Sequence, residues 1–206
     1  MSPIMELRQY TLRPGRRDEL ITLFEREFVE PQERLGMHLA GMFRDVADPN
    51  RFVWLRGFPD LAARPVALAE FYTGPVWREH RDAANATMID SDDVLLLRSL
   101  RGLSTLPGPC PPVGSPAPDT QVGLTIHHFA APPSDDVVAQ VLARPALAVY
   151  LTEPSENLFL ALPVREGEHV LVTIGEPGER LPDSSREPDR LRLAPTGRSR
   201  LRQWCA

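Results

Sequence analysis

The sequence contains no lysine, because all 23 basic residues among its 206 are arginine. A chain without lysine cannot form a lysine Schiff base or use a lysine as general base. It has two cysteines, Cys110 and Cys205, and neither has a CxxC neighbour or a histidine at metal-ligand spacing. Zinc and redox motifs are therefore unsupported, and we expect two free thiols, with a Cys110–Cys205 disulfide as the alternative.

Several other signals are absent as well. No apolar run approaches the roughly 18 residues of a membrane helix, and the first residues lack the pattern of a signal peptide. The net charge of −5 provides no basic excess for nucleic acid. The motifs HxxxH, HExxH, GxSxG and a phosphate loop are missing. We therefore expect a cytoplasmic protein that has no metal site and no membrane or nucleic-acid partner.

Proline, in contrast, is abundant and unevenly distributed. The chain has 22 prolines, of which 7 precede residue 107 and 15 follow from there. Six of them lie within residues 107–118, a density that fits neither a helix nor a central strand. At roughly 150 residues per domain, the length allows one large domain or two small halves. We predict a first half at 1–105, a proline-rich linker at 106–120 and a second half at 121–206.

The first half alternates strand and helix patterns. We predict a helix over Arg16–Leu35, with a kink or interruption at Pro31. The Asp48-Pro-Asn50 turn indicates a hairpin. The order β-α-β-β-α-β is typical of a ferredoxin-like unit. The other expected elements are strands at Glu6–Leu12, Leu39–Val46, Arg51–Gly57 and Val94–Leu100, and helices at Leu61–Tyr72 and Val76–Met88.

The second half begins in the same way and then departs from the pattern. Ser134 is expected to cap a short helix. The segment between Ile174 and Leu191 is too polar and too rich in proline for a second helix. The fold class we predict is α+β, with tandem ferredoxin-like repeats forming an α/β barrel and the second repeat abbreviated. An uncovered sheet face could equally be hidden by a second chain. Strands are expected at Val122–Phe129, Leu147–Thr152, Val170–Ile174 and Leu191–Leu193.

Among the histidines, His80 is the best placed for chemistry. It shares a helix face with Trp77 and Ala84, where an imidazole beside an indole could act as general base or bind a flat ligand. The alternative is a histidine paired with an acidic residue at the surface. His38 and His169 are expected to be solvated, His38 in a loop and His169 at the start of a strand.

A polar row on the first strand supplies the second candidate. Arg8 and Tyr10 lie on one face with Glu6, so Arg8 could bind a carboxylate or stabilise an enolate-like oxygen. An ion pair between Arg8 and Glu6, or one across strands, is the structural alternative. Trp54 lies on a strand face with Phe52 and is expected in the core unless it forms the wall of a flat apolar pocket.

The remaining candidates lie in the second half. His127 and His128 are adjacent on a strand, so at most one of them can face a given cavity, and a shared metal ion is not expected. Arg165, like Glu153 and Glu156, lies beside a long connection, where binding residues often occur. Ion pairs at the rim are the alternative for these charges.

Several stretches of the chain together match the pattern of one known family. They are Glu6–Gly15, Gly41–Phe43, Asn50–Phe58, Asp60, Arg64, Phe71-Tyr72 and Pro75–Trp77, then Thr152–Asn157, Leu162–Gly167 and Leu193–Ser199. With these stretches the chain resembles the NIPSNAP family, whose fold belongs to the dimeric α/β-barrel superfamily. The resemblance implies the fold and, from the wider superfamily, a cofactor-independent enzyme of monooxygenase, isomerase or dehydratase type acting on a small aromatic or polyketide-like metabolite. A non-enzymatic small-molecule or haem-binding protein, or an interaction scaffold, is the alternative. A small-molecule ligand, no cofactor and a homo-oligomer are expected, with His80, Arg8 and Tyr10 catalytic and Trp54, Trp77, His128 and Arg165 in contact with the substrate.

Overall fold

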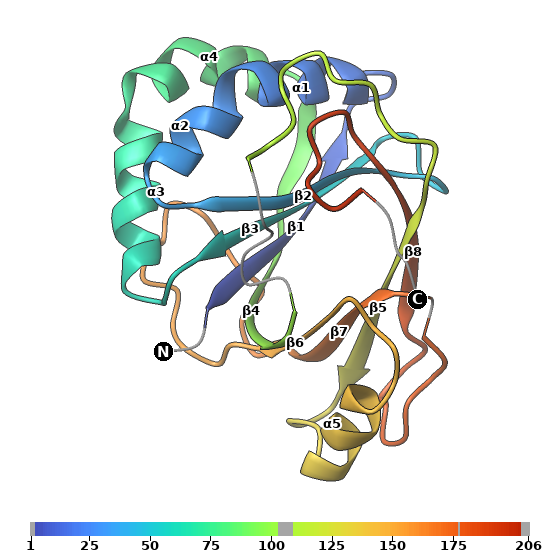
Figure 1. The fold of residues 1–206 in the computed structure, drawn as a ribbon. Coiled ribbons are helices and arrows are strands. Elements are labelled where there is room, and N and C mark those ends of the chain that lie inside the picture. Colours follow the sequence, from blue (N-terminus) through green and yellow to red (C-terminus); the bar gives the residue numbers. More distant parts are fainter. Residues whose placement is uncertain (1–2, 103–108, 177, 203–206) are drawn as a thin grey trace.

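The computed structural model describes residues 3–102, 109–176 and 178–202. Within them, strands β1 to β8 form one closed antiparallel barrel in the order β1-β3-β2-β8-β5-β7-β6-β4 (Figure 1). The barrel is therefore completed within a single chain. The strands are β1 Ile4–Leu12, β2 His38–Asp45, β3 Arg51–Phe58, β4 Met88–Arg101, β5 Val122–Phe129, β6 Ala148–Thr152, β7 His169–Gly175 and β8 Asp189–Pro195.

The strands of the two halves meet at two seams. β1 to β4 lie in the order β4-β1-β3-β2, and β5 to β8 lie in the order β6-β7-β5-β8. Pairing of β4 with β6 and of β2 with β8 closes the barrel. The predicted hairpin at Asp48-Pro-Asn50 is confirmed, because β2 and β3 pair antiparallel on either side of it. β4 is longer than the predicted strand Val94–Leu100, because the polar residues at its start also pair with β1, as far as Met88.

Alternating side chains divide the barrel into an inside and an outside. The inside is a dry core to which both halves contribute, including Leu7, Val53, Leu124 and Val172. On the outside of the first half, a second core contains Tyr10, Trp54 and Leu96 and is covered by helices. Figure 1 shows α1 to α4 gathered over this part of the barrel, whereas α5 lies against the other half.

The first helical segment continues through Pro31. It consists of α1 (Arg17–Leu23), a π-helical turn η1 (Phe24–Phe28) and α2 (Val29–Arg34). The helix does not end at Pro31, but its regular α-helical geometry is interrupted by the π turn just before that residue. A proline ring clashes with the carbonyl one turn earlier in a regular helix, and the wider π turn before Pro31 provides the extra space. α3 (Ala63–Thr73) and α4 (Pro75–Asn85) follow, with Pro75 in the first turn of α4 as expected.

The second half has less cover. Its helix α5 (Asp135–Leu142) is capped by Ser134, whose side chain accepts from the backbone N–H of Val137. Residues 178–188 contain no helix, which confirms the expectation that this polar, proline-rich segment cannot form a second one. Loops, together with α5, therefore lie over the outside of β6 and β7, and they leave room for a pocket.

The described part of the proline-rich segment packs against the chain near Arg198. The Cys110 thiol donates to the carbonyl of Arg198 at 3.0 Å, and the Arg198 guanidinium donates to the carbonyl of Pro111 at 2.7 Å. Burial raises the pKa of the Cys110 thiol. Cys110 is free, whereas Cys205 lies outside the described residues.

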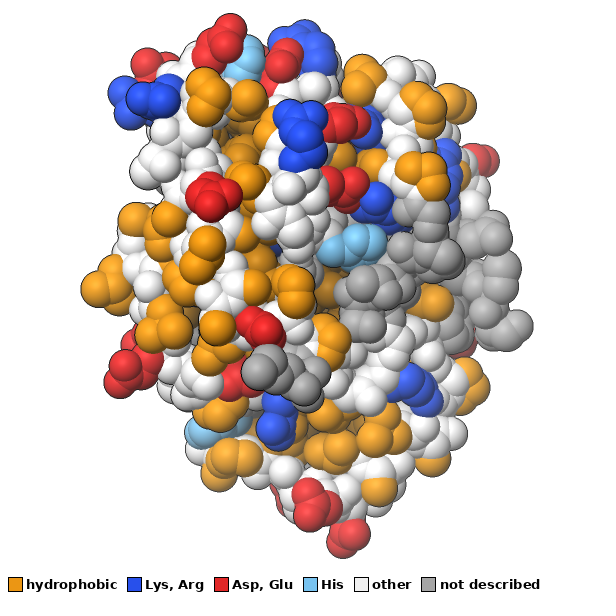
Figure 2. Space-filling view, turned by 60° about the vertical axis from the view of Figure 1, so that its left-hand side comes forward, with side chains coloured by type: hydrophobic (Ala, Val, Ile, Leu, Met, Phe, Trp, Pro, Cys, Tyr) orange, Lys and Arg blue, Asp and Glu red, His pale blue; other side chains and the backbone are white. Residues whose placement is uncertain are grey.

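Several large hydrophobic side chains reach the surface. Val66, Leu158 and Leu160 are 59%, 58% and 84% exposed. Figure 2 shows hydrophobic side chains grouped on the face that the α3 and α4 side of the molecule presents. Among the described helices, none has both the length and the apolar character needed to cross a membrane.

Candidate functional site

A buried cluster of charged side chains lies between the first-half strands and their helices. The Glu6 carboxylate accepts from Arg8 at 2.9 Å, from Arg56 at 2.6 Å and from Arg64 at 2.7 Å. None of these four side chains is more than 1% exposed. The ion pair between Arg8 and Glu6, which was the alternative to ligand binding by Arg8, is thus present. Glu6 also pairs across strands with Arg56.

Strand geometry explains how these groups meet. The two-residue period of β1 puts Glu6, Arg8 and Tyr10 on its outer face. In the register between β1 and β3, Glu6 lies opposite Arg56 and Arg8 lies opposite Trp54. The fourth member of the charged cluster comes from α3, which packs over the same face.

The cluster carries more positive than negative charge, because three guanidinium groups share one carboxylate. Burial alone would raise the pKa of Glu6, but Arg56, Arg8 and Arg64 hold it far below its usual range. Two amide oxygens help to satisfy the guanidinium groups. Gln32 accepts from Arg56 at 2.8 Å, and Asn157 accepts from Arg64 at 2.9 Å.

Two buried nitrogens in this region have no hydrogen-bond partner within the described part of the chain. They are Nη2 of Arg64 and Nε1 of Trp54. A buried donor without a partner is costly, so both nitrogens favour an acceptor brought by a ligand or by water.

Beside the cluster lies a small aromatic cavity of about 30 Å³. The Arg8 guanidinium lies 5.4 Å from the Trp54 ring and donates to the Tyr10 hydroxyl at 3.1 Å. Burial raises the pKa of Tyr10, although Arg8 opposes this shift, so the phenol keeps its proton at neutral pH. The cavity is lined by Tyr10, Leu20, Phe24, Phe28, Gln32, Trp54, Phe71, Tyr72, Trp77, Ala84 and Met88.

His80 lies at the edge of this aromatic group. Its ring centroid is 6.3 Å from that of Phe28, and Trp77, one helical turn earlier, lines the cavity. Its Nε2 lies 3.4 Å from a carboxylate oxygen of Glu27, and its side chain is 21% exposed. The predicted alternative, a helix histidine paired with an acidic residue, is therefore realised.

The structure does not bring His128 and Arg165 to this site. His128 bonds to Asp189 at 2.8 Å in the second half. Arg165 pairs with Glu168 at 2.6 Å and with Asp93 at 3.2 Å, at the rim of a second and larger pocket.

The other histidines lie on strands, and two of the three lie where they were predicted. His127 lines a separate cavity of about 180 Å³ under α5, on the opposite face of β5 from His128, in agreement with the alternation of a strand. His169 begins β7 as expected. His38 is the first residue of β2 and pairs with Gly57, so its predicted loop position is wrong, because β3 extends the ladder by one residue.

Of the four charged residues in the cluster, the sequence predicted only Arg8 as a site residue. Glu6 was expected only as its structural partner, and the two other arginines were missed. Arg56 shares a strand face with Trp54, and this two-residue spacing was the available signal. Arg64, Gln32 and Asn157 come from elements remote in sequence, and nothing in their local pattern indicates that they converge on Glu6.

Comparison with known proteins identifies the fold of the whole chain. A protein described as a candidate monooxygenase from Fusobacterium nucleatum is 10% identical, with 95% of this chain and 93% of that chain covered and a TM-score of 0.56. A similar protein from Lactobacillus acidophilus is 12% identical, with 95% and 94% covered and a TM-score of 0.51. At such low identity the likeness concerns the fold. No curated protein sequence matches the chain.

Comparison of the first half is more specific. The NIPSNAP family model matches residues 5–101. A NIPSNAP-like domain protein from Burkholderia xenovorans is 30% identical, with 52% of this chain and 92% of that chain covered and a TM-score of 0.45. The matched residues include β1, β3 and α3, which carry the charged cluster. The chain therefore belongs to the NIPSNAP family.

Proposed function

We propose that the chain is a cofactor-independent enzyme that acts on a small aromatic or polyketide-like metabolite between the strands and helices of the first half. The observation that carries this proposal is the buried excess of positive charge beside an aromatic cavity. Aromatic walls favour a flat ligand, and guanidinium charge favours its anionic form. A phenol or an enol that loses its proton at this site has both properties.

Each residue has a defined role in this proposal. His80 accepts the proton of the substrate hydroxyl, and Glu27 orients the imidazole. Arg8 and Tyr10 stabilise the resulting oxyanion. Trp54 and Trp77 form the apolar walls.

In the oxygenase form of the reaction, dioxygen converts a ring CH2 group of the substrate into a carbonyl. One oxygen atom enters the ring and the other leaves as water with both hydrogens. Isomerisation and dehydration start from the same anion.

The size of the cavity adds a conformational requirement. A volume of about 30 Å³ holds one or two water molecules, which is far less than an aromatic ring needs. Entry of the substrate therefore requires Tyr72 and Trp77 to rotate or α4 to move. The π-helical turn η1 supplies Phe24 and Phe28 to the same wall, and such turns are frequent at functional sites.

Oxidation of dithranol, an anthrone with two phenolic hydroxyls, tests the proposal. We expect the protein to accelerate quinone formation and oxygen uptake above the rate in buffer. Replacement of the general base in His80→Ala should lower kcat by about 100-fold or more. Stopped-flow absorbance and an oxygen electrode measure both rates.

Arg78→Ala is the matched control, because Arg78 is an exposed residue on the same helix. It should keep the wild-type rate. A His80→Ala protein that turns over dithranol as fast as the wild type would exclude the assigned role of His80. A wild-type rate equal to that of buffer would exclude dithranol-like substrates.

Non-enzymatic binding of a small molecule or of haem, or a scaffold role, is the second candidate. The observation that favours it is the pairing of Arg8 and His80 with carboxylates of the chain itself. Binding of dithranol without quinone formation in the same assay would support this second candidate.

Two further features of the chain belong to the proposal. The strand orders β4-β1-β3-β2 and β8-β5-β7-β6 support tandem ferredoxin-like repeats, because each places its four strands in the same sequential pattern.

We also propose a homo-oligomer, which the exposed Val66, Leu158 and Leu160 support. Light scattering on a size-exclusion column should give a mass above the 23.0 kDa of one chain, and a monomer mass would exclude it.

A further inference from the structure

A further pocket lies in the second half, away from the charged cluster. Its volume is about 410 Å³, within the range of small-molecule sites. It lies outside the seam of β4 and β6, where Leu96, Leu151 and His169 line its floor. The connection between β6 and β7 and the loop with Pro132 and Pro133, which precedes α5, form the rest of its lining.

Backbone hydrogen bonds hold the pocket open in a fixed shape. The N–H of Glu153 donates to the carbonyl of Leu96 at 2.9 Å, and the N–H of Arg165 donates to that of Val94 at 2.8 Å. The long 152–169 connection is thereby tied to β4 at both of its ends. Pro132, Pro133, Pro154 and Val164 add apolar wall. A site of this kind needs little reorganisation to accept a ligand.

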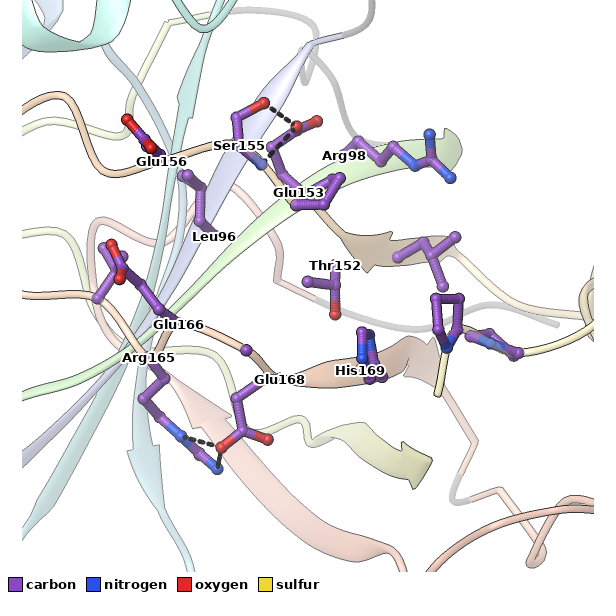
Figure 3. Close-up of a pocket in the computed structure, with 16 residues that line it drawn as sticks. Leu96, Arg98, Thr152, Glu153, Ser155, Glu156, Arg165, Glu166, Glu168 and His169 are labelled. Carbon is purple, nitrogen blue, oxygen red and sulfur yellow. Dashed lines mark hydrogen bonds and ion pairs between the residues drawn. The ribbon is translucent and has the colours of Figure 1, made fainter. Parts of the chain in front are cut away.

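Charged side chains lie at the two ends of the pocket. Figure 3 shows Arg98 and His169 toward one end and Glu156 and Glu166 toward the other, with Leu96 and Thr152 between them. Within the described residues, Arg98, Glu156 and Glu166 form no ion pair, so their charges are available to a ligand.

The other charged lining groups are already engaged. Arg165 is neutralised by Glu168 and Asp93, and the Glu153 carboxylate accepts from the backbone N–H and the hydroxyl of Ser155 (Figure 3). Arg98 at one end and Glu156 and Glu166 at the other therefore carry charges that no ion pair within the described residues neutralises. Glu153 also keeps its negative charge, because the hydrogen bonds from Ser155 do not neutralise a carboxylate.

We infer that this pocket binds a small zwitterionic ligand of the amino-acid or short-peptide class. The carboxylate of the ligand lies at Arg98 and His169, its ammonium group lies at Glu156 and Glu166, and its apolar body contacts Leu96 and Leu151. A purely anionic or purely cationic ligand would leave the charges at one end without partners. The inference does not depend on the proposed function, which concerns the other half of the barrel.

Isothermal titration calorimetry with L-leucyl-L-leucine tests this inference. The free dipeptide should bind, whereas its N-acetyl derivative and its C-terminal amide should each bind at least about tenfold more weakly, because each lacks one charge-assisted contact. Arg98→Gln should weaken binding of the free dipeptide about tenfold and remove the distinction between the free dipeptide and the amide. The double variant Glu156→Gln/Glu166→Gln should remove the distinction between the free dipeptide and the N-acetyl form.

Arg78→Gln, which replaces an exposed arginine outside the pocket, is the control and should bind like the wild type. Tyr10→Phe should also bind like the wild type, which separates this site from that of the proposed enzyme. Failure of the free dipeptide to bind, or equal binding of all three peptides, would overturn the inference. Preferential binding of one blocked peptide would overturn it as well.

Discussion

Replacement of Glu6 by glutamine is expected to destabilise the fold by about 3–5 kcal/mol. The Glu6 carboxylate is completely buried and is the shared partner of Arg8, Arg56 and Arg64. Glutamine keeps the shape and one acceptor oxygen but removes the charge, so three guanidinium groups remain buried without it. Urea unfolding at pH 7, followed by circular dichroism, measures the loss.

Two variants make this result specific. Glu19→Gln removes a carboxylate from its ion pair with Arg16, whose members are 52% and 42% exposed, and it should cost much less stability than Glu6→Gln because solvent screens the pair. Adding Arg64→Met to Glu6→Gln removes one of the uncompensated charges and should recover part of the stability. A loss below about 1 kcal/mol in Glu6→Gln would show that another group or solvent compensates the cluster.

Acidification from pH 8 to pH 5 is expected to cost the wild type about 2 kcal/mol through His127. Burial, together with repulsion from Arg190 and Arg144, lowers the pKa of His127 to about 4. In the unfolded chain the imidazole titrates near 6.5, so the unfolded state binds more protons between these two values. Stability therefore falls as the pH falls through 6.5 toward 4.

Replacement of the imidazole in His127→Phe should flatten this dependence. Nδ1 of His127 is buried without a hydrogen-bond partner in the described part of the chain, so the variant loses no contact at that atom. Ile126→Val, at the neighbouring buried position, is the control. It should lower stability by about 1 kcal/mol equally at every pH. Urea unfolding at pH 5, 6.5 and 8 compares the three proteins, and an unchanged slope in His127→Phe would contradict the assignment.

The sequence by itself determined the elements of the fold and much of their order. Alternation of large side chains in β1 and β3, the turn at Asp48-Pro-Asn50 and the cap at Ser134 are local signals, and each is realised. The polar stretch after Ile174 correctly indicated the lack of a second helix, since none occurs within the described residues 178–188. The two-residue period of β1 also places Glu6, Arg8 and Tyr10 on one face, although it does not indicate which groups they contact.

Only the tertiary structure decided what that face does. Whether Glu6 has one arginine partner or several depends on other elements, such as α3, which brings Arg64 to Glu6 from 58 residues away. A loop still further along the chain brings Asn157 to Arg64. Closure of the barrel within one chain and the pocket outside the β4–β6 seam also arise from contacts between distant parts of the chain. Such contacts join segments remote in sequence, and no local periodicity encodes which of them will meet.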